Sequence, residues 1–517
     1  MSQPTPGDML DAAASTTGAS ILAGGVWKTA SGVVPQFYVL AQSVAAARFL
    51  GPRGMGLQSF IAFAEFAVVT LAASGFSVAL MRYIGETLGR GQPEALRALV
   101  RWAWRVLGVG ALAGGGILVG AAAAGADPRA AWLLAAVAGT VGILHTVPSA
   151  VLIGAQRWRA ASIVGLVTGT IATAATIVVL WLGGGIVGMF AVEAATAVLN
   201  LLWTGAYARR ALPAVATIPG SPLELRRDVL RYALVATATS VLTFIVWRRS
   251  ELFFLKRYST DDEIAFYSVA FASVTALTAI PLGLSTVITP AIATLFGAGA
   301  EARIRTAYAR GLRLLLFLGL PLTAAALALG PTALRLVYGN SYRASGAVLL
   351  ILLLPFPLIP VVQFARAFMT GLGRLRAGFV MNAFAAVVNV ALDFALIPGR
   401  GAVGAAIANS TAQVIAGIPV LIYMARHLDG VHWRAQALAR NVVAAGAAGL
   451  VAWGLVRLVG GAGGLFIGLA AGTVAFAALG RALRVLPGDD AAWLEHAVGA
   501  RGGGKVGRAV RFFGGPR

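Results

Sequence analysis

Predominantly apolar runs of about 20 residues recur along the chain, and each is long enough to cross a hydrocarbon layer roughly 30 Å thick. Examples are Val106 to Ala124, Ile163 to Leu182, Leu312 to Gly330 and Ala377 to Pro398. The chain is 59% hydrophobic and only 12% charged, which leaves no room for a large water-soluble domain. The sequence therefore predicts an all-α integral membrane protein.

Polar connections divide the chain into about fourteen predicted spans. They begin near residues 20, 57, 99, 130, 160, 185, 230, 264, 311, 345, 376, 402, 440 and 463. Connections after even-numbered spans carry roughly 22 Lys and Arg, and those after odd-numbered spans roughly 9. Because basic residues concentrate in cytoplasmic loops, we expect both termini in the cytoplasm. The first 19 residues lack the basic start of a secretory signal, so the first apolar stretch is expected to remain as a membrane helix.

An internal repeat relates the two halves of the chain. The pattern G-x-x-R-x-R-A occurs at residues 154–160 and 371–377, and a Gly-rich pattern occurs at 183–188 and 399–404. The two pairs are offset by 217 and 216 residues. Six spans per half is an even number, so both halves enter the membrane from the same side and the repeat is parallel. Such lobes enclose a central cavity that opens to either face, as in transport by alternating access.

These patterns predict two lobes of six helices, followed by two extra helices. The predicted parts are a cytoplasmic N-terminal segment (1–19), an N-lobe (20–208), a cytoplasmic linker (209–229), a C-lobe (230–426), helices 13 and 14 (427–485) and a basic cytoplasmic tail (486–517).

Several functional classes lack support in the sequence. The net charge of +22 is scattered instead of forming one basic patch with aromatics, so we expect no nucleic-acid partner. Cysteine is absent, and the four histidines form no HExxH pattern. No phosphate-binding loop occurs either. We therefore expect no catalytic residue, no metal site and no cofactor.

Charges inside predicted helices mark the expected transport path, because an ionised side chain in the hydrocarbon core costs at least about 2.5 to 3.5 kcal/mol. The strongest cluster is the segment from Trp247 to Glu251, with Arg248 and Arg249 adjacent, and Lys28 is expected to face it. Guanidinium groups suit phosphate oxygens, so these cations favour an anionic substrate. The candidate cavity cations are Lys28, Arg48, Arg82, Arg248 and Arg249.

Two acidic residues complete the candidate site. Glu65 and Glu251 either pair with the cations or carry a coupling proton or sodium ion. Simpler roles remain open for other charges near helix ends. Arg48 and Arg82 can extend to the membrane interface, and Asp393 can cap a helix or pair with Arg400.

The segments 47–56 (ARFLGPRGMG) and 75–82 (GFSVALMR) resemble the opening of bacterial polysaccharide flippases called Wzx. These belong to the multidrug/oligosaccharidyl-lipid/polysaccharide exporter superfamily. Looser similarity occurs at 266–270, 338–342 and 389–406, so the resemblance covers about residues 20 to 430. Of the candidate cations, only Arg48 and Arg82 lie in the matching motifs.

The resemblance implies a V-shaped, two-lobe fold with a cationic central cavity. It implies a transporter, not an enzyme, that moves a polyprenyl-diphosphate-linked oligosaccharide from the inner to the outer leaflet of the cell membrane. Membrane lipid and this oligosaccharide are the expected partners, with other polysaccharide assembly proteins as further candidates. A cation-coupled exporter of drugs or small metabolites is the alternative. A membrane-embedded glycosyltransferase is disfavoured because the external loops are short and poor in acidic residues, and a non-transporting scaffold stays open.

Overall fold

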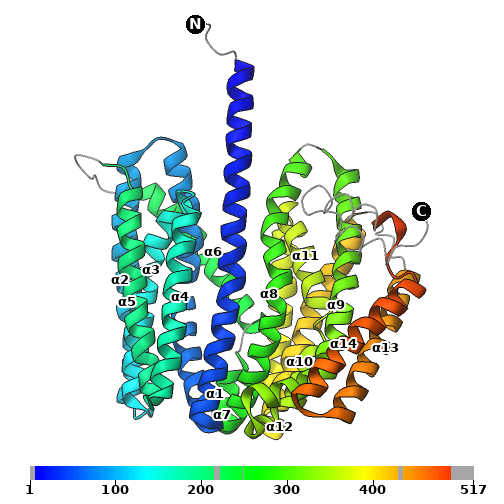
Figure 1. Cartoon of the computed structure of the whole chain (residues 1–517). Helices are drawn as coiled ribbons and strands as arrows, with labels where there is room; N and C mark the ends of the chain where they lie inside the picture. Colours follow the sequence, from blue (N-terminus) through cyan, green and yellow to red (C-terminus); the bar gives the residue numbers. More distant parts are fainter. Residues whose placement is uncertain (1–5, 215–221, 248–249, 298, 429–434, 491–517) are drawn as a thin grey trace. The chain divides into compact units, whose positions relative to one another are not determined.

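The computed structural model describes residues 6–214, 222–247, 250–297, 299–428 and 435–490. Within these ranges, the side chains of residues 6–32, 247, 279–291, 293–294, 297 and 375 are not described. The regular elements in the described ranges are α-helices and one short 3-10 helix (Figure 1). The predicted all-α architecture is confirmed.

Unit 1, the first of two compact units, comprises residues 1–50 and 57–244. Its helices are α1 (Pro6–Gly89), α2 (Pro93–Ala123), α3 (Arg129–Gly154), α4 (Trp158–Trp181), α5 (Gly185–Ala211) and most of α6 (Leu223–Trp247). The core of unit 1 includes Leu99 and Leu107 of α2 with Ile143 of α3, all fully buried. Val229 and Ala233 of α6 also join this core, and α6 up to Phe244 belongs to unit 1.

Unit 2 comprises residues 51–56 and 245–517. Its helices are α7 (Glu251–Tyr258), α8 (Asp261–Gly297), α9 (Glu301–Tyr338), the 3-10 helix η1 (Asn340–Tyr342), α10 (Ser345–Leu353), α11 (Leu358–Gly371), α12 (Leu375–His427), α13 (Ala435–Val459) and α14 (Gly461–Ala482). Buried aromatic rings join two of these helices, because Tyr308 of α9 packs on Phe364 and Phe368 of α11. Helices α13 and α14 pack on each other and on α9.

Two long helices are each interrupted by a break in the backbone. The backbone leaves the helical region at Gly51 of α1 (φ 69°) and at Gly401 of α12 (φ 51°), in the left-handed region that favours glycine. In the described residues, ten helices are long and apolar enough to cross a membrane, and the bent pair α10 and α11 forms one more. The predicted count of fourteen differs because it takes α1 and α12 as two spans each and α8, a helix of 37 residues, as one more.

The repeated sequence patterns adopt matching backbone conformations. Gln156 and Gly373 both have positive φ, 60° and 71°, and each precedes an arginine that starts the next helix. The arginine N–H donates to a carbonyl five residues earlier, over 2.8 Å for both Arg157 and Arg374. The internal repeat is therefore visible in the turns as well as in the sequence.

Many large apolar side chains point outward from the bundles of both units. Leu112 and Trp181 in unit 1 and Leu458 and Phe466 in unit 2 each expose more than 70% of their surface. So much exposed apolar area is incompatible with water and typical of a lipid-facing surface. The chain is a multi-pass membrane protein.

Candidate functional site

The most polar buried region of unit 2 lies where α7, α8 and the two halves of α12 come together. Glu251 lies about two helical turns from the end of α7, and Tyr267 about two turns into α8. Asp393 and Asn409 lie about two turns before and after the break at Gly401. These side chains therefore meet roughly 10 Å below the end of the bundle, and all four are fully buried.

The end of the bundle holds these helices in register. The carboxylate of Glu263 in α8 accepts a hydrogen bond from the backbone N–H of Ala402, directly after the break in α12, over 2.6 Å. Gly56, in the segment of α1 that belongs to unit 2, lies against the carbonyl of Asp261 so closely that any Cβ would collide with it. The start of α8 is thus fixed both to α12 and to residues 51–56.

Three donors converge on the carboxyl group of Glu251. The hydroxyl of Tyr267 donates to Oε2 over 2.8 Å. The side-chain amide of Asn409 donates to Oε1 over 2.8 Å. Asn389 Nδ2 lies 3.3 Å from the same oxygen and shares its two hydrogens with the Ile245 carbonyl (3.2 Å), Ser250 and Asp393. These bonds orient Glu251 and partly offset the cost of burying it.

Asn389 and Asp393 add oxygen atoms to the same cluster. They lie one helical turn apart on α12, and the Asn389 amide donates to Asp393 Oδ2 over 3.4 Å. Asn389 Oδ1, Asp393 Oδ1 and Gln413 Oε1 are buried and accept no hydrogen bond. Asn389 Nδ2 thus lies within 3.4 Å of both the Glu251 and the Asp393 carboxyl groups. Two carboxyl groups beside unsatisfied amide oxygens form an environment that a monovalent cation or a proton stabilises.

The described residues contain no group of three or more His, Cys, Asp or Glu side chains suited to a metal ion. The cluster around Glu251 instead mixes carboxyl, amide and hydroxyl oxygens, which suit a hard cation such as sodium better than zinc or copper. We call the residues Glu251, Tyr267, Asn389, Asp393, Asn409 and Gln413 the unit 2 polar cluster.

Unit 1 contains its own buried carboxyl group. Glu65 in α1 is only 9% exposed, and its Oε2 atom has no hydrogen-bond partner. Its side chain packs against Gly139 of α3. An ionised carboxyl group without a hydrogen-bond partner is costly in such a place, so Glu65 stays a candidate for proton or ion coupling.

The predicted cations are only partly visible. Arg248, Arg249 and the side chain of Lys28 lie outside the described residues. Arg48 is exposed and lies one turn before the break at Gly51.

Arg82 is far from Arg48 along the bundle. It is exposed, and its guanidinium group lies 4.9 Å from the ring centroid of Tyr232 in α6. About 30 helical residues separate Arg82 from the break at Gly51, which corresponds to roughly 45 Å. The structure therefore does not bring Arg48 and Arg82 into one site.

Sequence reasoning identified Glu251 but missed most of the polar cluster. Of the roles left open for Asp393, the structure does not support a helix cap, because Asp393 lies in the interior of α12, fully buried and beside Asn389. The spacing of Asn389 and Asp393, four residues apart on one helical face, is the signal that would have found them.

Two family models match the chain. The model described as polysaccharide biosynthesis protein matches residues 21–296, and the model described as MatE matches residues 220–395. Comparison with curated proteins gives no match.

Solved structures share the fold at low identity. One is the lipid II flippase MurJ in an inward closed conformation, with 13% identity, a TM-score of 0.67, and coverage of 88% of this chain and 98% of that chain. Another is an inward-facing multidrug resistance MATE family transporter of the MOP superfamily, with 16% identity, a TM-score of 0.64, and coverage of 79% and 98%. A third is a MOP superfamily transporter from Pyrococcus furiosus, with 17% identity, a TM-score of 0.55, and coverage of 80% and 96%.

The fold and the family matches together define a membrane transporter of the MOP superfamily. The matched families and structures are transporters and flippases, not enzymes. More particularly, the polysaccharide biosynthesis model covers more than half of the sequence, and the chain belongs to that family. The resemblance to polysaccharide flippases is confirmed.

Proposed function

We propose that the protein flips a polyprenyl-diphosphate-linked oligosaccharide from the inner to the outer leaflet of the cell membrane, for cell-surface polysaccharide synthesis. The match of the polysaccharide biosynthesis family over residues 21–296 carries this proposal. The fold shared with a lipid II flippase over 88% of the chain supports a lipid-linked substrate. Both termini would lie in the cytoplasm, because the basic connections lie on that side.

Cations on the transport path would hold the diphosphate. Lys28, Arg248 and Arg249 are the proposed ligands, because they interrupt apolar spans and because guanidinium groups bind phosphate oxygens in a planar fork. The sugar would occupy the water-filled part of the cavity, while the polyprenyl chain stays in the bilayer. Arg48 and Arg82 are proposed to contact lipid phosphates near the two membrane surfaces.

A cation or proton in the unit 2 polar cluster would drive the cycle. Glu251 follows Arg249 by two residues and Arg248 by three, so a change at its carboxyl group would act close to the proposed substrate cations. If both carboxyl groups are ionised and no cation is bound, repulsion between Glu251 and Asp393 would oppose close packing of α7 against α12. Ion binding would favour one conformation of the transporter and so couple an ion gradient to flipping. Glu65 would be a separate protonatable group in unit 1.

The alternative is a cation-coupled exporter of drugs or small metabolites. The MatE match over residues 220–395 favours this function, and it requires the same ion site but no lipid-linked substrate. Other polysaccharide assembly proteins would be partners only of the flippase.

Deletion of the gene separates the two functions. For the flippase we expect lipid-linked oligosaccharide to accumulate facing the cytoplasm and the surface polysaccharide to be lost, with both restored by the wild-type gene. Accessibility of the lipid-linked sugar to an impermeant lectin measures its orientation. Normal surface glycan together with increased drug sensitivity would favour the exporter and overturn our proposal.

Replacement of both Arg248 and Arg249 by alanine should abolish complementation of the deletion strain. Loss of two charge-assisted contacts to a diphosphate corresponds to at least about 3 kcal/mol, or more than about 100-fold in substrate affinity. Surface glycan and membrane abundance are measured together. Arg226→Ala with Arg227→Ala, an adjacent arginine pair at the start of α6, is the matched control and should retain activity. Full activity of the Arg248/Arg249 variant would exclude these arginines as substrate ligands.

A further inference from the structure

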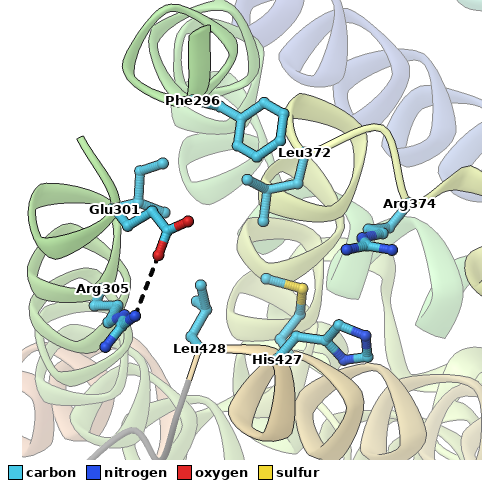
Figure 2. A pocket seen from close by; sticks show the side chains of 9 residues that line it. Phe296, Glu301, Arg305, Leu372, Arg374, His427 and Leu428 are labelled. Carbon is cyan, nitrogen blue, oxygen red and sulfur yellow. Dashed lines mark hydrogen bonds and ion pairs between the residues drawn. The ribbon is translucent and has the colours of Figure 1, made fainter. Parts of the chain in front are cut away.

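A pocket opens at the end of unit 2 where α8, α11 and α12 end and α9 begins. Figure 2 shows Glu301, Arg305, Arg374 and His427 around this opening, with Phe296 and Leu372 beside them. Its cavity volume is about 140 Å³. The three connections that form the pocket follow even-numbered predicted spans, so they belong to the end expected to face the cytoplasm.

The lining of the pocket combines an apolar wall with basic groups. Five apolar side chains line it, including Phe296, Leu372 and Met424, whereas Arg305, Arg374 and His427 supply nitrogen donors. The acidic residue in the lining is Glu301, which pairs with Arg305 over 3.3 Å. Both side chains of this ion pair are well exposed, 70% and 45%, so the pair is worth well under about 1 kcal/mol and exchanges readily.

The surroundings of the pocket are strongly positive. Arg303, Arg376 and Arg426 are exposed on the same helix ends. Together with Arg305 and Arg374 of the pocket lining they give these helix ends five arginines, whereas Glu301 is the acidic residue in the lining. The C-terminal ends of α8, α11 and α12 each carry a partial negative charge from the helix dipole, equivalent to about half an elementary charge. The positive charge of the arginines is larger than the sum of these three.

We propose that this pocket binds the phosphate headgroup of an anionic membrane phospholipid. Arg374 is well placed for this role, because its backbone N–H bonds to the carbonyl of Met369 over 2.8 Å and fixes the turn that carries it. A lipid phosphate would replace Glu301 as the partner of Arg305 and would also bind Arg374, while the apolar wall takes the glycerol end of the acyl chains. Basic pockets on the cytoplasmic side of membrane proteins bind headgroups in this way.

The apolar wall distinguishes a lipid from a free anion. Inorganic phosphate gains nothing from Phe296, Leu372 and Met424, whereas a phospholipid buries apolar atoms against them. The pocket also lies at the ends of membrane-spanning helices, where headgroups are concentrated. This inference concerns a lipid that stays in its own leaflet, and it holds whichever substrate the transporter carries.

Binding to the purified full-length protein in detergent tests the proposal. Native mass spectrometry with cardiolipin, phosphatidylglycerol and phosphatidylethanolamine measures lipid occupancy, and inorganic phosphate and pyrophosphate serve as free anions. We expect both anionic lipids to bind and to be retained better than phosphatidylethanolamine. Arg374→Gln should weaken this binding about 10-fold through the loss of one charge-assisted contact. Glu301→Gln should strengthen it about 3-fold, because it removes the competing carboxylate.

The repeat supplies a matched control. Arg157 occupies the position equivalent to Arg374 in unit 1, with nearly the same backbone angles, and is also exposed. Arg157→Gln removes the same charge and should change lipid affinity less than about 2-fold. Equal losses for Arg157→Gln and Arg374→Gln would overturn the assignment, because the effect would then reflect overall charge. Binding of free pyrophosphate as tightly as the lipids, or no response to Glu301→Gln, would overturn it as well.

Discussion

Replacement of Glu251 by glutamine should reduce transport to below about one-tenth of the wild-type level without loss of the fold. Glutamine keeps the size of the side chain but removes its charge, and its NH₂ group would face a donor, either Tyr267 or Asn409, where an oxygen now accepts. The cation would lose one of its two carboxyl ligands. Restoration of surface glycan in the deletion strain measures the effect.

The same substitution should remove the response of the protein to its coupling ion. If sodium binds in the unit 2 polar cluster, sodium should stabilise the wild-type protein by about 2.7 kcal/mol at a concentration of 100 times Kd, relative to potassium at equal ionic strength. Glu251→Gln should show no such difference in thermal unfolding. A wild-type protein that responds to pH but not to sodium would instead identify a proton as the ion at this site.

Asp393 provides an internal check on Glu251. If both carboxyl groups bind one ion, Glu251→Gln combined with Asp393→Asn should be little worse than either single variant, because each change already removes the ion. Asp262→Asn is the matched control, since Asp262 is exposed in the first turn of α8 and lies outside the polar cluster. Full complementation by the double variant would exclude ion coupling at this site.

The spans could be predicted because they depend on local sequence. Apolar runs and basic connections report directly on membrane crossing, and the two breaks inside long helices, at Gly51 and Gly401, lie within a few residues of predicted span boundaries near 57 and 402. The packing of α6 could not be predicted in this way. Hydropathy shows that Val229 and Ala233 are apolar but not which neighbouring helices bury them.

The site was harder to predict than the spans, because it is assembled from separate helices. Glu251 stands out as a charge in an apolar run, whereas Asn389, Asn409 and Tyr267 are neutral residues that also occur in ordinary helix packing. The sequence shows Asp393 only as a carboxyl group near Arg400 along the chain. Its actual environment depends on the break at Gly401, which brings the second half of α12 back beside the first. Sequence spacing alone does not contain that geometry.

Replacement of Asp490 by alanine should destabilise unit 2 by about 3 kcal/mol. Asp490 is fully buried beyond the end of α14 and is bound by two arginines of α9. Arg313 donates to both of its carboxylate oxygens, over 2.6 and 2.8 Å, and Arg310 donates over 3.2 Å. The variant leaves two guanidinium groups, each only about one-fifth exposed, without this carboxylate. The melting temperature of the purified protein should fall by at least about 5 °C.

Asp489 is the matched control for this prediction, because it is adjacent and exposed. Asp489→Ala should change the melting temperature by less than about 2 °C.

The triple variant that also carries Arg310→Ala and Arg313→Ala tests the cause. It should be more stable than the sum of the separate changes predicts, because the arginines no longer lack their partner once they are removed. Additive losses would mean that Asp490 acts by simple packing, together with its buried neighbours Val485 and Leu486. A non-additive result would mean that Arg310 and Arg313 fix the segment after α14 to α9, the helix on which α13 and α14 also pack. The two arginines would then contribute to stability as well as to the orientation of the chain in the membrane.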